Sequence, residues 1–458
     1  MNHMATHSPD QLEEQIGLWR GYVKRRQVIQ TTDIIELEDH LREQITGLMK
    51  AGLATDEAFL VAVKRLGKLD VLSQEFAREH SERLWKQLVL VSPETSEPAP
   101  RHRQETFVAF GLAILAAVLI KLPEIFGFAL DDEASFYMRN VSLFVLPVLA
   151  AYFIWKRQTS QRVIISAASG FMIGAIFANI YPFISGGSTE GLTSLHLPIA
   201  MWFIVGMTYA GKRWSEIAGR MDFIRFTGEL FIYYVLIALG GGVLTGFMFA
   251  IFQSIGFDLE PIMGTWIIPC GAAGAVIIGS WLVEAKQSVI ENMAPVLTRL
   301  FTPLFAVVLV VFLATVAFTG RGINVDRDIL IAFDLLLVVV LGLLVYSISA
   351  RRPDARIGTL DIMQIILLVS ALLTDAVALW AIASRITEFG FSPNRVAALG
   401  ENIILLVNLA WSTVLYLRFV RGRALFTQLE RWQTQYLLVY AVWAALVVIV
   451  FPPLFGYK

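Results

Sequence analysis

The stretch LVSALLTDAVALWAI, residues 368–382, decides the fold class of this chain. It is an apolar run with one carboxylate, Asp375, in its middle, and it extends to about residues 361–384. A hydrocarbon core about 30 Å thick is crossed by roughly 20 apolar residues of helix. We therefore predict that this run crosses a membrane, and the question is why the chain keeps an acid there.

Similar runs recur along most of the chain. Its 458 residues are 56% hydrophobic and only 16% charged, with a mean hydropathy of +0.63, whereas soluble proteins carry about 25% charged residues. The sequence thus predicts an all-α polytopic membrane protein with about 11 transmembrane helices and a small N-terminal cytoplasmic helical domain. The predicted spans are about 106–129, 138–155, 163–185, 195–211, 229–253, 262–284, 298–319, 328–349, 361–384, 401–419 and 434–455.

The basic residues between these spans indicate an orientation. If the N-terminus is cytoplasmic, the inner loops and their immediate flanks contain 16 Lys and Arg, and the outer loops with the C-terminus contain 6. Cytoplasmic loops of membrane proteins carry an excess of Lys and Arg. The pattern therefore predicts that the N-terminus is inside and the C-terminus is outside.

The first part of the chain has a different composition. Residues 1–105 contain 14 Lys and Arg and 17 Asp and Glu, which predicts a soluble head over residues 1–90. Apolar residues at helical spacing predict four helices there, one ending near residue 26 and three over about 34–50, 55–67 and 70–85. Gly52 is placed to end the second helix. The Pro-rich residues 91–105 predict a flexible linker to the membrane domain, residues 106–458.

The head resembles the bacterial HAAS or permease-prefix helical domain over roughly residues 10–85. The resemblance is carried by E-L-E-D-H-L at 36–41, A-G-L and D-E-A-F at 51–59, A-V-x-R-L-G at 62–67 and E-F-A at 75–77. It implies a regulatory or signalling head in front of a multi-pass membrane body. The body is similar to bacterial membrane families that carry this prefix and have no assigned chemistry, so no catalytic residue follows from the resemblance. A head that only stabilises or assembles the protein remains the alternative.

Few polar residues interrupt the spans. An ionisable group at the centre of a membrane helix costs at least about 2.5–3.5 kcal/mol on the insertion scale, so each one needs a partner, a cavity or a nearby interface. In the predicted orientation most of them fall in the outer half of the membrane, with Asp375 and Asn408 nearer the middle. The predicted intramembrane polar cluster is Lys121, Glu124, Asn179, Asp334, Asp375, Glu401, Asn408 and Ser412.

This cluster has two interpretations. It could line a polar cavity open to the outside, in which Lys121 pairs with Asp334 or Asp375, and Ala371 and Ala378 leave room beside Asp375. It could equally consist of hydrogen bonds and ion pairs that hold helices together. Glycines are interpreted as close helix packing, both in the G-x-x-x-G spacings of spans three and five and in the run at residues 240–242, for which a hinge is the alternative.

The sequence argues against an enzyme and predicts no catalytic residue, no cofactor site and no metal site. It contains neither H-E-x-x-H nor G-x-S-x-G, and Cys270 is its one cysteine. The net charge of −1 gives no indication of a nucleic-acid partner, which favours a basic surface.

Two functions remain open for a protein of the bacterial inner membrane. One is a permease-like protein that moves a small molecule or ion through the polar cavity under control of the head. The other is a sensor that relays ligand, lipid or envelope state to a cytoplasmic protein partner. The lipid bilayer is the predicted partner of the body in both cases, and the sequence leaves a homo-oligomer open.

Overall fold

The chain is an all-α polytopic membrane protein. The structure, a computed structural model, describes residues 12–13, 15–17, 19, 31–66, 100–130, 134–254, 258–285, 293–319, 327–351 and 357–458. The chain divides into two compact units, residues 1–98 and 99–458. The described part of the chain contains helices and no strand.

The first unit contains two long described helices, α2 (Thr31–Lys50) and α3 (Thr55–Leu66). Both were predicted; the predicted helix at 70–85 lies outside the described residues. Gly52 adopts a left-handed conformation with φ +95°, as predicted for the residue that ends α2. Leu41, Ile45 and Leu48 of α2 belong to a small core that also contains Ile16, Trp19, Ala58, Phe59, Ala62 and Val63.

The described residues of the second unit contain eleven helical segments that are long and apolar enough to cross a membrane. Each overlaps one of the eleven predicted spans, which confirms the predicted fold class. Its helices are α5 (Pro100–Lys121), η1 (Leu122–Phe126), α6 (Ala134–Arg157), α7 (Gln161–Ile180), α8 (Ser188–Ala210), η2 (Gly211–Ser215), α9 (Ile217–Ser254), α10 (Glu260–Ile262), η3 (Met263–Ile267), α11 (Ile268–Ala285), α13 (Met293–Thr319), α14 (Arg327–Ala350), α15 (Thr359–Phe389), α16 (Pro393–Val420), α17 (Phe426–Ile449) and α18 (Phe451–Leu454).

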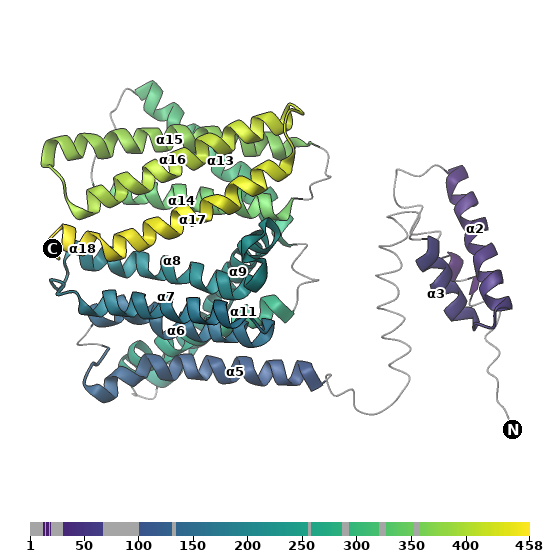
Figure 1. The fold of residues 1–458 in the computed structure, drawn as a ribbon, viewed down its shortest axis with the longest axis horizontal. Helices are drawn as coiled ribbons and strands as arrows, with labels where there is room; N and C mark the ends of the chain where they lie inside the picture. The colour runs from purple at the N-terminus through teal and green to yellow at the C-terminus, as the bar shows by residue number, and fades with distance from the viewer. Residues whose placement is uncertain are drawn as a thin grey trace. The chain divides into compact units, whose positions relative to one another are not determined.

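The helices of this unit form two groups, each with its own apolar core. Helices α5 to α8 and α11 surround one core, and α13 to α17 surround the other. Figure 1 shows α5 and α15 at opposite edges of the helical array, with α8 and α17 between them. Helices α8 and α17 pack against each other, as do α9 and α14. Helix α9 contributes side chains to both cores, and α8 also packs against α16 and α9 against α17, so several contacts join the groups.

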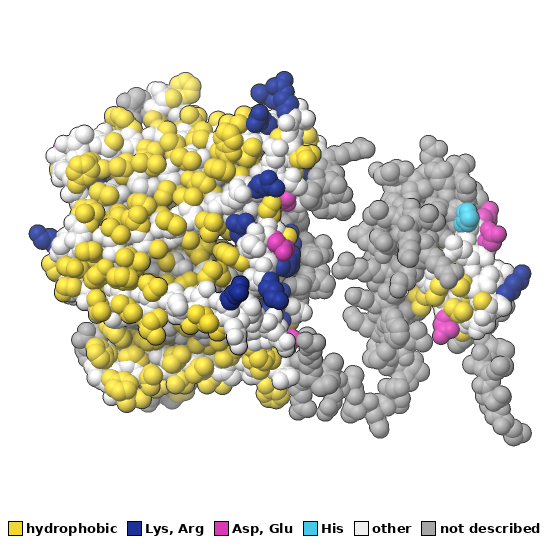
Figure 2. Space-filling view, in the orientation of Figure 1, with side chains coloured by type: hydrophobic (Ala, Val, Ile, Leu, Met, Phe, Trp, Pro, Cys, Tyr) yellow, Lys and Arg dark blue, Asp and Glu magenta, His cyan; other side chains and the backbone are white. Residues whose placement is uncertain are grey.

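The surface of this unit agrees with a lipid environment. Figure 2 shows apolar side chains over the flanks of the helices, whereas Lys and Arg side chains gather mainly at one end. That end contains Arg157 at the end of α6, Arg225 near the start of α9 and Arg421 after α16. The described helices thus place basic segments that are distant in sequence at one end of the unit.

Two predicted boundaries are wrong. Helix α5 begins at Pro100, so residues 100–105 are helical, although they were predicted as linker; residues 91–99 lie outside the described part. Proline suits the first turn of a helix because its missing N–H has no partner there anyway. Helix α9 begins at Ile217, twelve residues before the predicted span. The helix continues beyond the apolar stretch because the polar residues in that segment are compatible with a helix.

The glycines have different roles from one helix to another. A Cβ atom at Gly170 would lie 2.6 Å from Ile204 Cδ1, and one at Gly174 would lie 2.8 Å from Met201 Cε, which confirms the predicted close packing between α7 and α8. The prediction of close packing at the glycines of span five, including the run at residues 240–242, is wrong. Helix α9 runs unbroken through residues 240–242, and a Cβ at any of these glycines or at Gly246 would have no described neighbour within 4 Å.

The closest helix approach of this kind gives a stability prediction. A Cβ atom at Gly400 of α16 would overlap Cη2 of Trp443 on α17. We expect Gly400→Ala to lower the free energy of unfolding by about 1–3 kcal/mol, because the rigid indole ring must move. The measurement is unfolding of the purified protein in detergent.

Gly342→Ala is the matched control, since Gly342 lies inside α14 and its Cβ would have no described neighbour within 4 Å. Alanine there should be neutral or stabilising by up to about 1 kcal/mol, because alanine loses less conformational entropy than glycine in a helix. Equal effects of the two substitutions would contradict the packing of Gly400 against Trp443.

Candidate functional site

The eight residues of the predicted polar cluster do not lie together. Lys121 and Glu124 are at the end of α5 and in η1, at the opposite edge of the array from α15 (Figure 1). The Lys121 amine forms an ion pair with Glu124, donates to the backbone carbonyl of Thr265 at 2.8 Å, and lies 4.4 Å from the ring centre of Trp266. The prediction that Lys121 pairs with Asp334 or Asp375 is therefore wrong.

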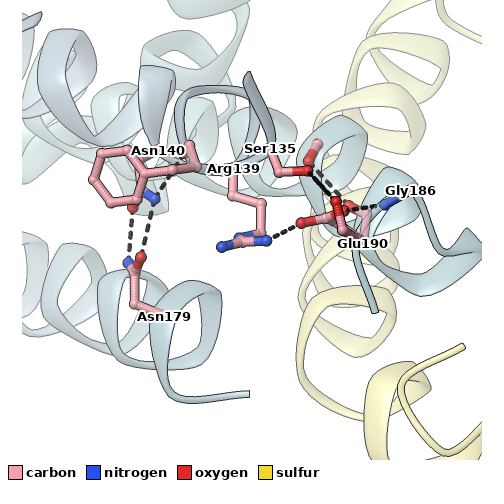
Figure 3. Close-up of polar contacts among 9 residues, drawn as sticks. Ser135, Arg139, Asn140, Asn179, Gly186 and Glu190 are labelled. Atoms are coloured by element: carbon pink, nitrogen blue, oxygen red, sulfur yellow. Dashed lines mark hydrogen bonds and ion pairs between the residues drawn. The ribbon is translucent and has the colours of Figure 1, made fainter. Parts of the chain in front are cut away.

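Asn179 belongs to a second, separate group (Figure 3). Its side-chain amide exchanges two hydrogen bonds with that of Asn140 on α6, at 2.7 and 3.0 Å. Each amide also donates to a backbone carbonyl of its own helix. Both amides are satisfied locally, so this pair connects α6 to α7 in the way expected of hydrogen bonds between membrane helices.

Beside this amide pair lies a buried ion pair that sequence reasoning missed. Glu190, in the first turn of α8, is 1% exposed and forms an ion pair with Arg139 of α6. Its carboxylate also accepts hydrogen bonds from the Ser135 hydroxyl at 3.1 Å and the Gly186 amide at 2.8 Å (Figure 3). The positive end of the α8 dipole favours a carboxylate at this position. The contacts make Glu190 a structural acid that links α6 to α8.

Asp375 differs from the other acids of the spans whose side chains the structure describes. It lies sixteen residues from the first residue of α15 and fourteen from the last, and its side chain is 0% exposed. Neither carboxylate oxygen has a hydrogen-bond partner among the described residues. Ala371 and Ala378, the small residues predicted beside it, are themselves buried. No interaction with a described residue therefore offsets the free-energy cost of burying this acid.

Two further residues of the cluster, Asp334 and Glu401, lie on helices that pack against α15. Asp334 on α14 is close enough to repel the charge of Asp375, and one Asp334 oxygen accepts a hydrogen bond from the Asn402 amide at 2.8 Å. Glu401, the neighbour of Asn402 on α16, contacts His196 of α8 at 2.6 Å. The His196 Nδ1 lies 2.8 Å from the carbonyl of Leu192. Asp334 thus interacts with the charges of both Asp375 and Glu401, and Glu401 is the acid that contacts the imidazole.

Asn408 and Ser412 of α16 form the centre of a separate, satisfied network. The Asn408 amide nitrogen donates to Tyr440 at 2.7 Å and to Gln433 at 3.1 Å. Its oxygen accepts from Trp432 at 2.7 Å and from Ser412 at 3.1 Å. These bonds connect α16 to α17 and give Asn408 a structural role.

The contacts therefore divide the predicted cluster. Asp334, Asp375 and Glu401 form what we call the acidic centre, and Asn408 with Ser412 supports α17 beside it. Lys121, Glu124 and Asn179 lie elsewhere. Sequence reasoning missed Asn402 and His196. Asn402 could have been found because it is the neighbour of Glu401 in the sequence. No local pattern indicated that His196 would contact an acid 205 positions further along the chain.

The described residues contain no group of three His, Cys, Asp or Glu side chains that could hold a metal ion. What the acidic centre can do chemically is bind a proton or a monovalent cation, since either would neutralise a buried carboxylate. Comparisons with protein-family models, curated proteins and solved structures found no match to this chain.

Proposed function

We propose that this chain is a permease-like protein of the bacterial inner membrane that moves a proton or another small cation, with Asp375 as the binding group. The observation that carries the proposal is the complete burial of the Asp375 carboxylate without a described partner. An isolated charge in such a place costs several kcal/mol. Binding of a cation or proton removes that cost, and its release restores it, so the site is suited to cycling between two states.

The surroundings of Asp375 support the same proposal. Intramembrane acids that face the interior of a helix bundle are characteristic of ion pathways and proton relays. Asp334 and Glu401, which contacts His196, lie on neighbouring helices. In the predicted orientation, with the N-terminus inside, these groups extend from the middle of the membrane toward its outer face. They offer a sequence of exchange sites between Asp375 and the outside.

The experiment is ion exchange by the full-length protein in proteoliposomes. Equilibrium exchange of H⁺, Na⁺ and K⁺ is measured separately against protein-free vesicles. We expect exchange of at least one ion, and we expect Asp375→Asn to reduce it to the protein-free level because the amide cannot take up a cation in place of the carboxylate.

Glu388→Gln is the matched control, since Glu388 lies on the same helix but is exposed near its end. It should keep the wild-type rate. The proposal is wrong if the wild type exchanges none of the three ions, or if Asp375→Asn exchanges as fast as the wild type.

A second function, sensing without transport, is supported by the head. Residues 1–98 form a compact unit with their own apolar core, which suits a regulatory domain such as the resemblance to the permease-prefix domain implies. In that case the acidic centre would bind a cation without moving it across the membrane. Cation binding would change how the head interacts with a cytoplasmic partner. Cation-dependent stabilisation of the wild type, absent in Asp375→Asn and unaccompanied by exchange, would favour sensing.

A further inference from the structure

A cavity of about 540 Å³ lies at the end of the second unit where α6 and α8 end and α7 and α9 begin. This volume is within the range of small-molecule sites, about 300–1,000 Å³. The cavity is distinct from the acidic centre, because no residue of that centre lines it. In the predicted orientation it faces the cytoplasm, at the depth of the lipid headgroups.

The wall of this cavity carries more cations than acids. Its charged residues are Arg157, Lys212, Arg213 and Arg225 against Asp222 and Glu229. Figure 2 shows that Lys and Arg side chains gather at this end of the helices. Clustered cations in a concave site at a membrane interface favour an anionic ligand.

Two of these cations already have carboxylate partners. Arg157 contacts both oxygens of Glu284, at 2.9 and 3.1 Å, and Arg213 contacts Asp222 at 3.1 Å. The other two do not. Arg225 donates to the backbone carbonyl of Ser349 and forms no ion pair with a described residue, although Glu430 is near enough to interact with its charge. Lys212 is exposed and likewise forms no ion pair with a described residue.

The cavity also offers neutral donors. Tyr209 is only 7% exposed and its ring packs against Phe153 and Phe226, yet its hydroxyl has no hydrogen-bond partner among the described residues. Ser160, the residue before α7, lines the cavity and its hydroxyl makes no capping bond. The first amides of a helix point outward without intrahelical partners and attract anions.

We propose that this cavity binds a phosphate group, supplied by an anionic phospholipid of the cytoplasmic leaflet. Lys212 and Arg225 provide the charge, while the Tyr209 hydroxyl and the start of α7 provide neutral donors. The cavity lies at the ends of the spans, where phosphate headgroups are concentrated, which favours a lipid over a free anion. Trp214 in η2 is also placed as an interface residue.

The test uses the purified full-length protein in a neutral detergent and titration calorimetry. The probes are dihexanoyl phosphatidylglycerol, dihexanoyl phosphatidylcholine and inorganic phosphate. We expect saturable binding of phosphatidylglycerol, and at least about tenfold weaker binding by the double variant Lys212→Ala, Arg225→Ala, because hydrogen bonds to charged groups are lost. Tyr209→Phe should weaken binding by about two- to fivefold and removes only a hydroxyl, so it tests the site if the double variant does not fold.

The matched control is Arg421→Ala, Arg423→Ala, which removes two exposed cations at the same end of the helices, outside the cavity. It should bind phosphatidylglycerol like the wild type. Binding of inorganic phosphate as tight as that of phosphatidylglycerol, with the same dependence on the variants, would support the phosphate site and assign its ligand to a free anion. The proposal is overturned if Tyr209→Phe and the cavity double variant both bind like the wild type, or if the control loses as much affinity as they do.

Discussion

Asp375→Leu is expected to stabilise the detergent-solubilised protein by about 1–3 kcal/mol, the approximate cost of a buried polar group without a partner. Leucine has the same branching of side-chain heavy atoms as aspartate, although its methyl groups are larger than carboxylate oxygens, and it needs no hydrogen bond. The same variant should show no ion exchange. A gain in stability together with a loss of function is the pattern expected of a strained functional site.

Asp361→Leu is the matched comparison for this variant. Asp361 lies on the same helix and is also buried, at 5% exposure, but its carboxylate accepts from Tyr416 at 3.0 Å and from the Gly358 amide at 2.8 Å, and it pairs with Arg351 at 3.4 Å. Leucine there removes the carboxylate that pairs with Arg351 and accepts from Tyr416 and Gly358, and should cost about 3–5 kcal/mol.

The two substitutions are thus expected to have opposite signs, and denaturation in one detergent measures both. Similar losses of stability at Asp361 and Asp375 would show that the Asp375 carboxylate has a stabilising partner. The proposal that it binds a cation or proton would then lose its main support.

Arg139→Met is expected to destabilise the protein by about 3–5 kcal/mol, because it leaves the buried Glu190 carboxylate without its cation. The double variant Arg139→Met, Glu190→Gln should recover most of that loss, since no charge is then stranded. Unfolding of both variants in detergent measures the coupling between the two residues directly.

Arg162→Met is the control for the loss of a basic residue, because Arg162 is exposed in the first turn of α7. Its effect should stay within about 0.5 kcal/mol. If the double variant of Arg139 and Glu190 is as unstable as Arg139→Met alone, the arginine stabilises the fold through contacts other than its pair with Glu190.

The cavity lined by Lys212 and Arg225 and the acidic centre around Asp375 lie at different depths and require different chemistry. The first is suited to an anion at the headgroup level, and the second to a cation or proton inside the bilayer. A protein with both would sense the lipid leaflet through one and exchange ions through the other. The variants proposed for the two sites do not overlap, so either function can be tested without disturbing the other.

The sequence by itself determined the fold class, because the signal for a membrane span is local. Twenty apolar residues must cross the hydrocarbon core as a helix, whatever surrounds them, so the run around Asp375 could be recognised without its neighbours. The end of α2 at Gly52 was equally local, since glycine has no steric penalty at positive φ. Composition alone also separated the charged head from the apolar body.

Only the tertiary structure decided which polar residues meet. One helix face can be derived from sequence spacing, but two helices can be neighbours or lie at opposite edges of the array at any sequence separation. Helix α5, which ends at Lys121, therefore lies at the opposite edge of the array from α15, which carries Asp375, and His196 met Glu401 from a distant part of the chain. The same holds for the glycines of α9, because the spacing that suits close packing does not determine whether another helix lies there. That Asp375 has no described partner is likewise a result of packing between helices, and it could not be derived from the fifteen residues around it.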